Sequence, residues 1–361
     1  MTRKAAPFLS SAIVACMTSL TLACGSGSSK VQPPQAPDVY VAGFEAGDTV
    51  PEIAEYWKNG TAVALGTDTC GSDATSIFVS GPDVYVAGNV CGTTRQVAQY
   101  WKNGVAVPLT DGASNDAFAM SIFVDGSDVY VAGWDGGVAE YWKNGVAIPL
   151  TSFNGSNGAE AWAIAVSEGD VYVAGWQYVT TQVNPTTTYT GPVAMLWKNG
   201  VPTELSDPLG VGITQSIFLS GGDIYIAGNS CPAAQPPPPP PGCNQATFWK
   251  NGTPTVLTDQ TPTGATSVAV SGADVYVVGN QDLGQGAAIA DFWKDGSLTQ
   301  LTSGGPTAAN AVVVSGSDVY VAGANIVGGI EMAGYWKNGA FTPVTNGTHN
   351  ASGFAMTVVS H

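Results

Sequence analysis

One four-strand unit recurs seven times along the chain, and this repetition limits the possible folds more than any other feature. Each copy carries a DVYVAG-type string followed by a YWKNG-type string. The first string begins at Asp38, Asp83, Asp128, Asp170, Asp223, Asp274 and Asp318. The second string has its tryptophan at Trp57, Trp101, Trp142, Trp197, Trp249, Trp293 and Trp336. A repeat of about 45 residues is typical of arrays in which each unit packs on its neighbours.

Each unit predicts four antiparallel strands, which we name A to D from the inside of the fold outwards. Strand A is an SIFVS-type run and strand B the DVYVAG-type run; both are rich in β-branched and aromatic residues, and a short Gly-containing turn separates them. Strand C contains the YWK string, and the following Asn-Gly predicts a type I′ turn into strand D. Four such strands per repeat predict one blade of a β-propeller.

The first unit lacks strand A, and the end of the chain supplies a match for it. The last residues read GFAMTVVSH, with Met356 and Val358 in the core-facing register. We therefore expect this segment to pair beside residues 38–43 and to close the ring without an unpaired inner edge. The sequence thus predicts an all-β fold, a single seven-bladed β-propeller of four-stranded antiparallel blades over residues 38–361.

The repeat resembles that of bacterial lipoproteins built of WKNG-type β-propeller repeats. The resemblance rests on the WKNG strings and covers residues 38–361. It implies the propeller architecture and no particular activity.

The N-terminal segment predicts export rather than folded structure. Arg3 and Lys4 precede an uncharged apolar stretch over residues 5–23, as in a signal peptide spanning residues 1–23. Residues 24–37 are Gly/Ser-rich and then Pro-rich, which is typical of a flexible tether.

The signal peptide ends in LTLAC, which resembles a bacterial lipoprotein signal. The resemblance implies cleavage before Cys24 and acylation of that cysteine, although Thr21 stands where the family usually has Leu. Cys16 ends a second candidate box, and an ordinary secretory signal is the alternative. We expect an exported lipoprotein at the outer membrane or cell surface, with the periplasmic face as the alternative. Its only contact with the membrane would be the lipid anchor.

The charge of the chain argues against nucleic acid as a partner. The formal net charge is −16, whereas a phosphate backbone requires a basic surface. Seven of the 11 Lys and Arg residues follow the repeat tryptophans. Because strands B and C are antiparallel, each of these lysines should face the Asp that opens strand B. We interpret these pairs, and the repeat tryptophans between blades, as scaffold, and we expect a monomer.

The loops at the two ends of the blades differ. The A–B and C–D turns are short and nearly constant, whereas the B–C and D–A loops vary in length and composition. The variable loops emerge together on one face, which we call the variable face. Binding residues usually lie on variable loops of a rigid scaffold.

Four cysteines follow Cys24, an even number that suits disulfides in an oxidising compartment. The register around the Gly81-Pro82 turn places Cys91 opposite residue 72, close enough for a Cys70–Cys91 bridge. Cys231 and Cys243 bracket a proline-rich B–C loop in blade five, and we expect a second bridge there.

No cofactor is predicted. A four-cysteine metal site lacks the necessary Cys-x-x-Cys spacing. No EF-hand pattern is present, so Ca²⁺ bound by the Asp-rich D–A loops remains only an alternative.

One asymmetry points to a working region on the blade-three and blade-four side of the variable face. Trp134 and Trp176 follow the Val-Ala-Gly of strand B, where the other blades have Phe44, Asn89, Asn229, Asn280 or Ala324. Trp162 lies near the start of strand A of blade four, at the channel mouth. We expect Phe118 in a D–A loop and Tyr178 in the long B–C loop of blade four. The full set of candidate ligand-binding residues is Trp134, Trp162, Trp176, Phe118, Tyr178, Asp111, Asp116, Asp135 and Glu160.

Aromatic rings beside carboxylates suit a sugar, because rings stack on its apolar faces while carboxylates accept hydrogen bonds from its hydroxyls. The alternative is that these rings only pack the loops. The sequence therefore favours a surface binding module for a glycan or protein ligand over catalysis. Two other functions stay open, a polysaccharide hydrolase or lyase using loop carboxylates, and an assembly scaffold without a small-molecule site.

Overall fold

The computed structural model describes residues 35–46, 52–66, 71–150, 158–205, 211–231, 244–257, 263–284, 287–301 and 307–361. Residues 36–361 form one compact unit. The predicted signal peptide, Cys16, Cys24 and most of the tether lie outside these ranges, so those interpretations remain predictions. None of the described residues belongs to a helix of the length and hydropathy that a membrane span requires.

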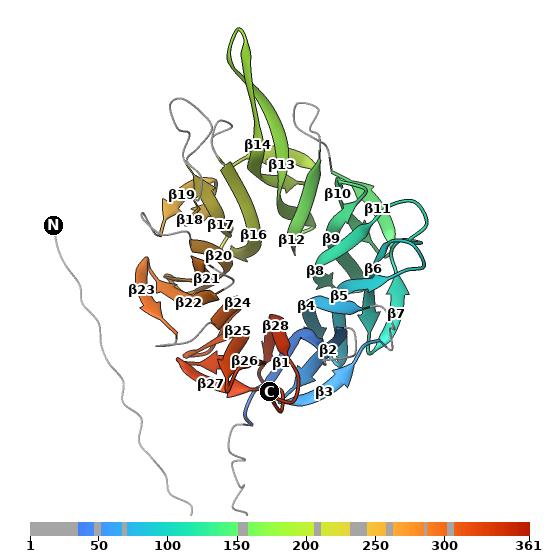
Figure 1. Ribbon diagram of the computed structural model, residues 1–361, viewed down its shortest axis with the longest axis vertical. Coiled ribbons are helices and arrows are strands. Elements are labelled where there is room, and N and C mark those ends of the chain that lie inside the picture. The colour runs from blue at the N-terminus through green and yellow to red at the C-terminus, as the bar shows by residue number, and fades with distance from the viewer. Residues whose placement is uncertain are drawn as a thin grey trace, which may run out of the picture. The chain divides into compact units, whose positions relative to one another are not determined.

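The described strands form seven four-stranded antiparallel sheets arranged as the blades of a ring (Figure 1). From the inside outwards, blades one to three are β28 (Ala351–Val359), β1 (Asp38–Glu45), β2 (Ile53–Lys58), β3 (Thr61–Ala64); β4 (Ser72–Ser80), β5 (Asp83–Cys91), β6 (Gln96–Lys102), β7 (Val105–Pro108); β8 (Ala117–Asp125), β9 (Asp128–Asp135), β10 (Val138–Lys143), β11 (Val146–Pro149). Blades four and five are β12 (Ala159–Ser167), β13 (Asp170–Asn184), β14 (Thr187–Lys198), β15 (Val201–Glu204); β16 (Val211–Ser220), β17 (Asp223–Cys231), β18 (Gln245–Lys250), β19 (Thr253–Val256). Blades six and seven are β20 (Thr263–Ser271), β21 (Asp274–Gly284), β22 (Ala287–Lys294), β23 (Ser297–Gln300); β24 (Thr307–Ser315), β25 (Asp318–Val327), β26 (Ile330–Lys337), β27 (Ala340–Pro343).

The last strand of the chain closes the ring, as predicted. β28 pairs antiparallel with β1, with Asp38 opposite Val359 and Val41 opposite Met356. Met356 is buried and Val358 packs against the same hydrophobic cluster. The seven-bladed fold and its closure by the C-terminal strand are therefore confirmed.

The repeat tryptophans fill the space between neighbouring blades. Trp101 of blade two packs against Tyr40 and Ala42 of blade one, and all seven rings are at most 1% exposed. Burial of about 200 Å² of aromatic surface contributes about 5 kcal/mol per ring. The prediction that these tryptophans are scaffold is confirmed.

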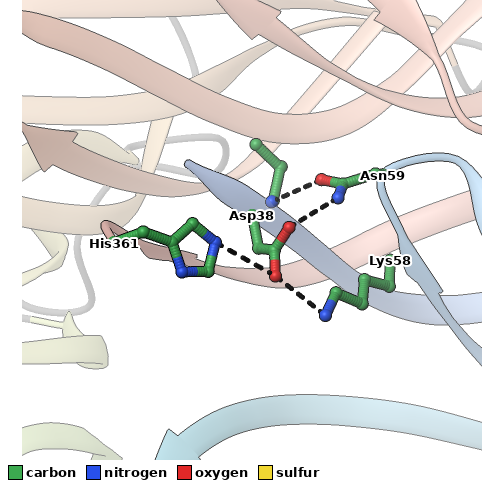
Figure 2. A network of polar contacts seen from close by, with 5 residues as sticks. Asp38, Lys58, Asn59 and His361 are labelled. Atoms are coloured by element: carbon green, nitrogen blue, oxygen red, sulfur yellow. Dashed lines mark hydrogen bonds and ion pairs between the residues drawn. The ribbon is translucent and has the colours of Figure 1, made fainter. Parts of the chain in front are cut away.

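The constant turns form the same polar network in six blades, and Figure 2 shows the one in blade one. The Asp38 carboxylate accepts hydrogen bonds from Lys58 at 2.8 Å and from the Asn59 side-chain amide at 2.7 Å. Asn59 in turn accepts a hydrogen bond from the Val39 backbone N–H. Asn59 has φ 50° and Gly60 φ 79°, the left-handed pair of the predicted type I′ turn. His361, unique to this blade, lies 3.4 Å from Asp38. In blade six Asp295 replaces the asparagine; it accepts the hydrogen bond from the Val275 N–H but has no amide to donate to Asp274.

Each inner strand carries a β-bulge that the sequence reading did not anticipate. In blade three the register shifts between Ala119 and Ser121, which leaves Met120 as the extra residue. The bulge brings the Phe118 carbonyl against Gly133 of β9, where a Cβ would overlap it. Only glycine fits this approach, which explains the Gly of every DVYVAG-type string.

Because of the bulge, the register between the strands that carry Cys70 and Cys91 differs from the expected one. Ser72 pairs with Val90, and the Cys91 N–H donates to the Gly71 carbonyl at 3.2 Å, so Cys91 lies opposite residue 71 rather than 72. The extra residue shifts the strand by one position toward Cys70. Cys70 and Cys243 lie outside the described residues, so both disulfides remain predictions.

Candidate functional site

Three aromatic side chains form a continuous stack on the variable face, between blades three and four. Phe118 and Trp134 are cross-strand partners in β8 and β9, with ring centroids 5.0 Å apart and an interplanar angle of 29°. Trp134 also stacks on Trp162 of β12, at 5.9 Å and 26°. Phe118 was expected in a D–A loop but is the second residue of β8, because this strand begins at Ala117, four residues before the SIFV string.

Glu160 connects this stack to a second aromatic pair. Its Oε2 accepts a hydrogen bond from the Trp162 indole N–H at 3.0 Å. Burial raises the pKa of Glu160, and hydrogen bonds from the Trp162 and Trp176 indoles oppose this effect. Trp176 in turn makes an edge-to-face contact with Tyr178, at 5.1 Å and 82°.

Tyr178 lies in a strand, although the sequence reading placed it in a long B–C loop. β13 and β14 continue outwards as a hairpin arm, which Figure 1 shows extending from the ring. The arm is rich in threonine, whose β-branched side chain favours a strand. Thr180 and Thr190 are cross-strand partners whose hydroxyls lie 2.8 Å apart. Tyr178 itself is 39% exposed.

A pocket of about 340 Å³ lies beside the outer end of the stack. Its lining includes the rings of Phe118 and Trp134 and the ion pair between Arg95 and Asp116, whose atoms are 3.1 Å apart. Asp116 also accepts a hydrogen bond from the Gln96 N–H, and these contacts lower the pKa of its carboxyl group. The pocket therefore combines aromatic faces with a fixed carboxylate and a guanidinium group.

Two of the predicted carboxylates lie away from the stack. Asp111 is exposed and accepts a hydrogen bond from the Ala113 N–H in its own turn. Asp135 follows Trp134 directly, so its side chain lies on the opposite face of the sheet. There Glu140 has a raised pKa, caused first by burial and second by the charge of Asp135.

Trp134 and Trp176 occupy a position that is structural in other blades. In blades two, five and six this residue is an asparagine that bonds to the inner strand of the next blade. Asn89 accepts from the Ala119 N–H, Asn229 from the Ala265 N–H, and Asn280 from the Ala309 N–H. Trp134 and Trp176 have no amide for this bond. Blades three and four therefore use the position for aromatic contacts instead.

Sequence reasoning missed a ring of residues at the mouth of the central channel. A cavity of about 340 Å³ is lined there by residues from all seven inner strands. Apart from Asp73, the lining residues are the bulge residues, namely Phe354, Thr75, Met120, Trp162, Gln215, Thr266 and Asn310. The signal was present as one variable position inside an otherwise repetitive strand A. Only Trp162 had been singled out.

No group of three or more His, Cys, Asp or Glu side chains suited to a metal ion occurs among the described residues.

Comparisons with known proteins identify the fold and no family. No family model matches the chain, and no curated protein matches it. Among solved structures, the tricorn protease aligns with a TM-score of 0.51 and 9% identity, over 91% of this chain and 36% of that chain. The β-propeller domain of the Trilobed protease from Pyrococcus furiosus aligns with a TM-score of 0.49 and 11% identity, over 87% and 99% of the two chains. At such low identity, the likeness concerns the β-propeller fold alone.

Proposed function

We propose that this protein is a surface binding module that holds a saccharide on the blade-three and blade-four side of its variable face. One observation carries the proposal. The ten tryptophans divide into seven buried repeat residues and three others, Trp134, Trp162 and Trp176, and all three others gather at this corner.

The contacts of these residues favour a sugar over a protein surface. The exposed parts of the Phe118, Trp134 and Trp162 rings offer apolar surface to the C–H groups of sugar rings. Carboxylates lie at its edge, Glu160 on one side and Asp116 on the other. Aromatic rings with a few fixed polar groups are the usual composition of a small-ligand site.

The proposal includes attachment to the membrane through a lipid on Cys24, in a lipoprotein of the WKNG-repeat type. The support for this part is the signal-like sequence and the tether that follows it. Mass spectrometry of the mature N-terminus tests this part of the proposal. A chain that keeps its signal peptide, or one that begins at Cys24 without a lipid, would contradict it.

A glycan array, followed by titration of the positive glycans, tests the binding proposal. We expect the exported protein to bind a defined set of glycans and Trp134→Ala to lose at least about tenfold in affinity, because an aromatic contact is removed. The melting temperature should fall by only a few degrees, since Trp134 is only partly buried and its contact with blade four is a single ring stack on Trp162.

Phe292→Ala is a useful control, because this aromatic residue lies in blade six, away from the stack. It should lower the melting temperature and leave glycan affinity unchanged. Two results would refute the proposal, namely a silent array with a co-purifying protein in place of a glycan, or a Trp134→Ala variant that loses binding only because it unfolds.

A further inference from the structure

The mouth of the central channel is formed by seven equivalent positions that carry different side chains. Around the ring, from blade one to blade seven, the bulge residues are Phe354, Thr75, Met120, Trp162, Gln215, Thr266 and Asn310. A bulge re-aims the extra side chain and is often found next to a functional site. Figure 1 shows the inner strands that present these residues surrounding the centre of the ring.

The residues next to each bulge are nearly constant, whereas the bulge residue is not. In blades three and four, for example, the bulge follows Ala119 and Ala161 and precedes Ser121 and Ala163. Small residues are needed there because neighbouring inner strands lie close together. The bulge residues comprise six residue types in seven blades. The scaffold therefore does not require a particular side chain at the bulge.

Of the four bulge residues with amide or hydroxyl side chains, three bond to the scaffold and one does not. The hydroxyls of Thr75 and Thr266 donate to the Ala119 and Ala309 carbonyls of the next blade, at 2.8 and 2.7 Å. The Asn310 amide likewise donates to the Gly353 carbonyl at 2.9 Å. The side chain of Gln215 makes no hydrogen bond to any described residue. Its amide is therefore available to a ligand.

The lining of the channel mouth is mostly uncharged. Trp162, Met120 and Phe354 supply apolar surface, and the remaining ring residues supply amides and hydroxyls. Asp73 is the one ionisable residue of the lining, and no Lys or Arg is part of it. Burial raises the pKa of the Asp73 carboxyl group, against the hydrogen bond from the Asn89 N–H. A complementary ligand is uncharged, with apolar faces and hydroxyl edges.

We propose that the channel mouth binds a single terminal sugar ring of the glycan, with Gln215 as a specificity-determining donor and acceptor. This inference rests on the proposed function and deepens it, because Trp162 belongs to both the stack and the channel mouth. The stack would hold the units that precede the chain end. The cavity of about 340 Å³ lies at the small end of the range for ligand pockets, which suits one terminal ring rather than an internal stretch of chain.

The test compares single sugar rings with longer chains. Probes are the methyl glycosides of glucose, galactose, mannose and N-acetylglucosamine, and oligosaccharides that end in the same units. Ligand-observed NMR measures affinity for the whole exported protein in zwitterionic detergent. We expect Gln215→Leu to weaken binding of a methyl glycoside about tenfold, through loss of hydrogen bonds to its hydroxyls. Gln182→Leu, an exposed glutamine on the β13–β14 arm, is the matched control and should bind normally.

The outcomes separate the two proposals. Trp134→Ala should weaken oligosaccharide binding while single glycosides still bind, and Gln215→Leu should weaken both. Oligosaccharide binding that depends on Trp134 but not on Gln215 would overturn the channel inference and leave the proposed function intact. Absence of binding by every methyl glycoside would overturn it as well. If methyl glycosides bind through Gln215 and Trp134→Ala has no effect on oligosaccharide binding, the stack is not part of the glycan site and the proposed function is wrong in that respect.

Discussion

Single residues at repeated positions show which parts of this propeller tolerate polar groups in the core. The position two residues before each repeat tryptophan is Glu140 in blade three, Gln99 in blade two and Asp291 in blade six. All three are buried. Burial raises the pKa of Asp291 to about 6. Burial, together with the charge of Asp135, raises the pKa of Glu140 to about 7.

The raised pKa of Glu140 predicts a loss of stability as the pH rises. The unfolded chain releases this proton near pH 4.5, whereas the folded protein holds it until about pH 7. Between pH 4.5 and about pH 7 the folded state binds more protons than the unfolded state. The free energy of unfolding therefore falls as the pH rises through this range, and it stays low above it. Glu140→Gln, which copies Gln99, should therefore melt about 2–4 °C higher than the wild type at pH 8. At pH 4 the two proteins should melt together, and parallel curves across the whole range would contradict this explanation.

At the scale of strands, the bulge explains several features of the repeat at once. It presents one side chain to the channel, and it requires glycine in the neighbouring strand B. In three blades an asparagine follows this glycine, and its side-chain oxygen accepts a hydrogen bond from a backbone N–H in the inner strand of the next blade. Asn280 both accepts from the Ala309 N–H at 2.8 Å and donates to the Ala309 carbonyl at 3.1 Å.

Loss of this inter-blade bond should destabilise the protein without affecting binding. Ala309 is fully buried, so Asn280→Ala leaves its backbone N–H without a partner. An unsatisfied buried donor costs about 1–3 kcal/mol. Denaturant unfolding should show this loss for Asn280→Ala, whereas glycan affinity stays at the wild-type value. Equal losses of stability in Asn280→Ala and Trp134→Ala would show that the stacked tryptophan is scaffold too.

At the scale of the whole molecule, ring closure depends on a strand that is distant in sequence. β28 pairs with β1 in its own blade. It also contacts β4 and β24, the inner strands of the two adjacent blades, so the ring of inner strands is continuous. Its end, Val359, lies opposite Asp38, in the place that the Ser80–Asp83 pair has in blade two. A two-residue turn would therefore join these ends directly.

A circular permutant uses this proximity. The chain would run from His349 to Val359, through Gly-Ser, and from Asp38 to Thr348. Because every strand keeps its partners, the permutant should unfold cooperatively and bind the same glycans. Deletion of residues 349–361 without permutation should abolish cooperative unfolding, since blade one then exposes its inner edge. Circular dichroism during heating measures both, and a permutant that fails to fold would contradict the closure described for β28.

The sequence by itself determined the strand count, the seven blades, the type I′ turns, the Asp–Lys pairs and the closure of the ring. Each depends on local pattern or on a repeat that can be counted along the chain. It also pointed to Trp134, Trp162 and Trp176. Only the tertiary structure decided which carboxylates join them, because one step along a strand turns Asp135 to the opposite face. The channel ring likewise required the fold, since its seven residues are separated by whole blades and meet only when the inner strands surround one axis.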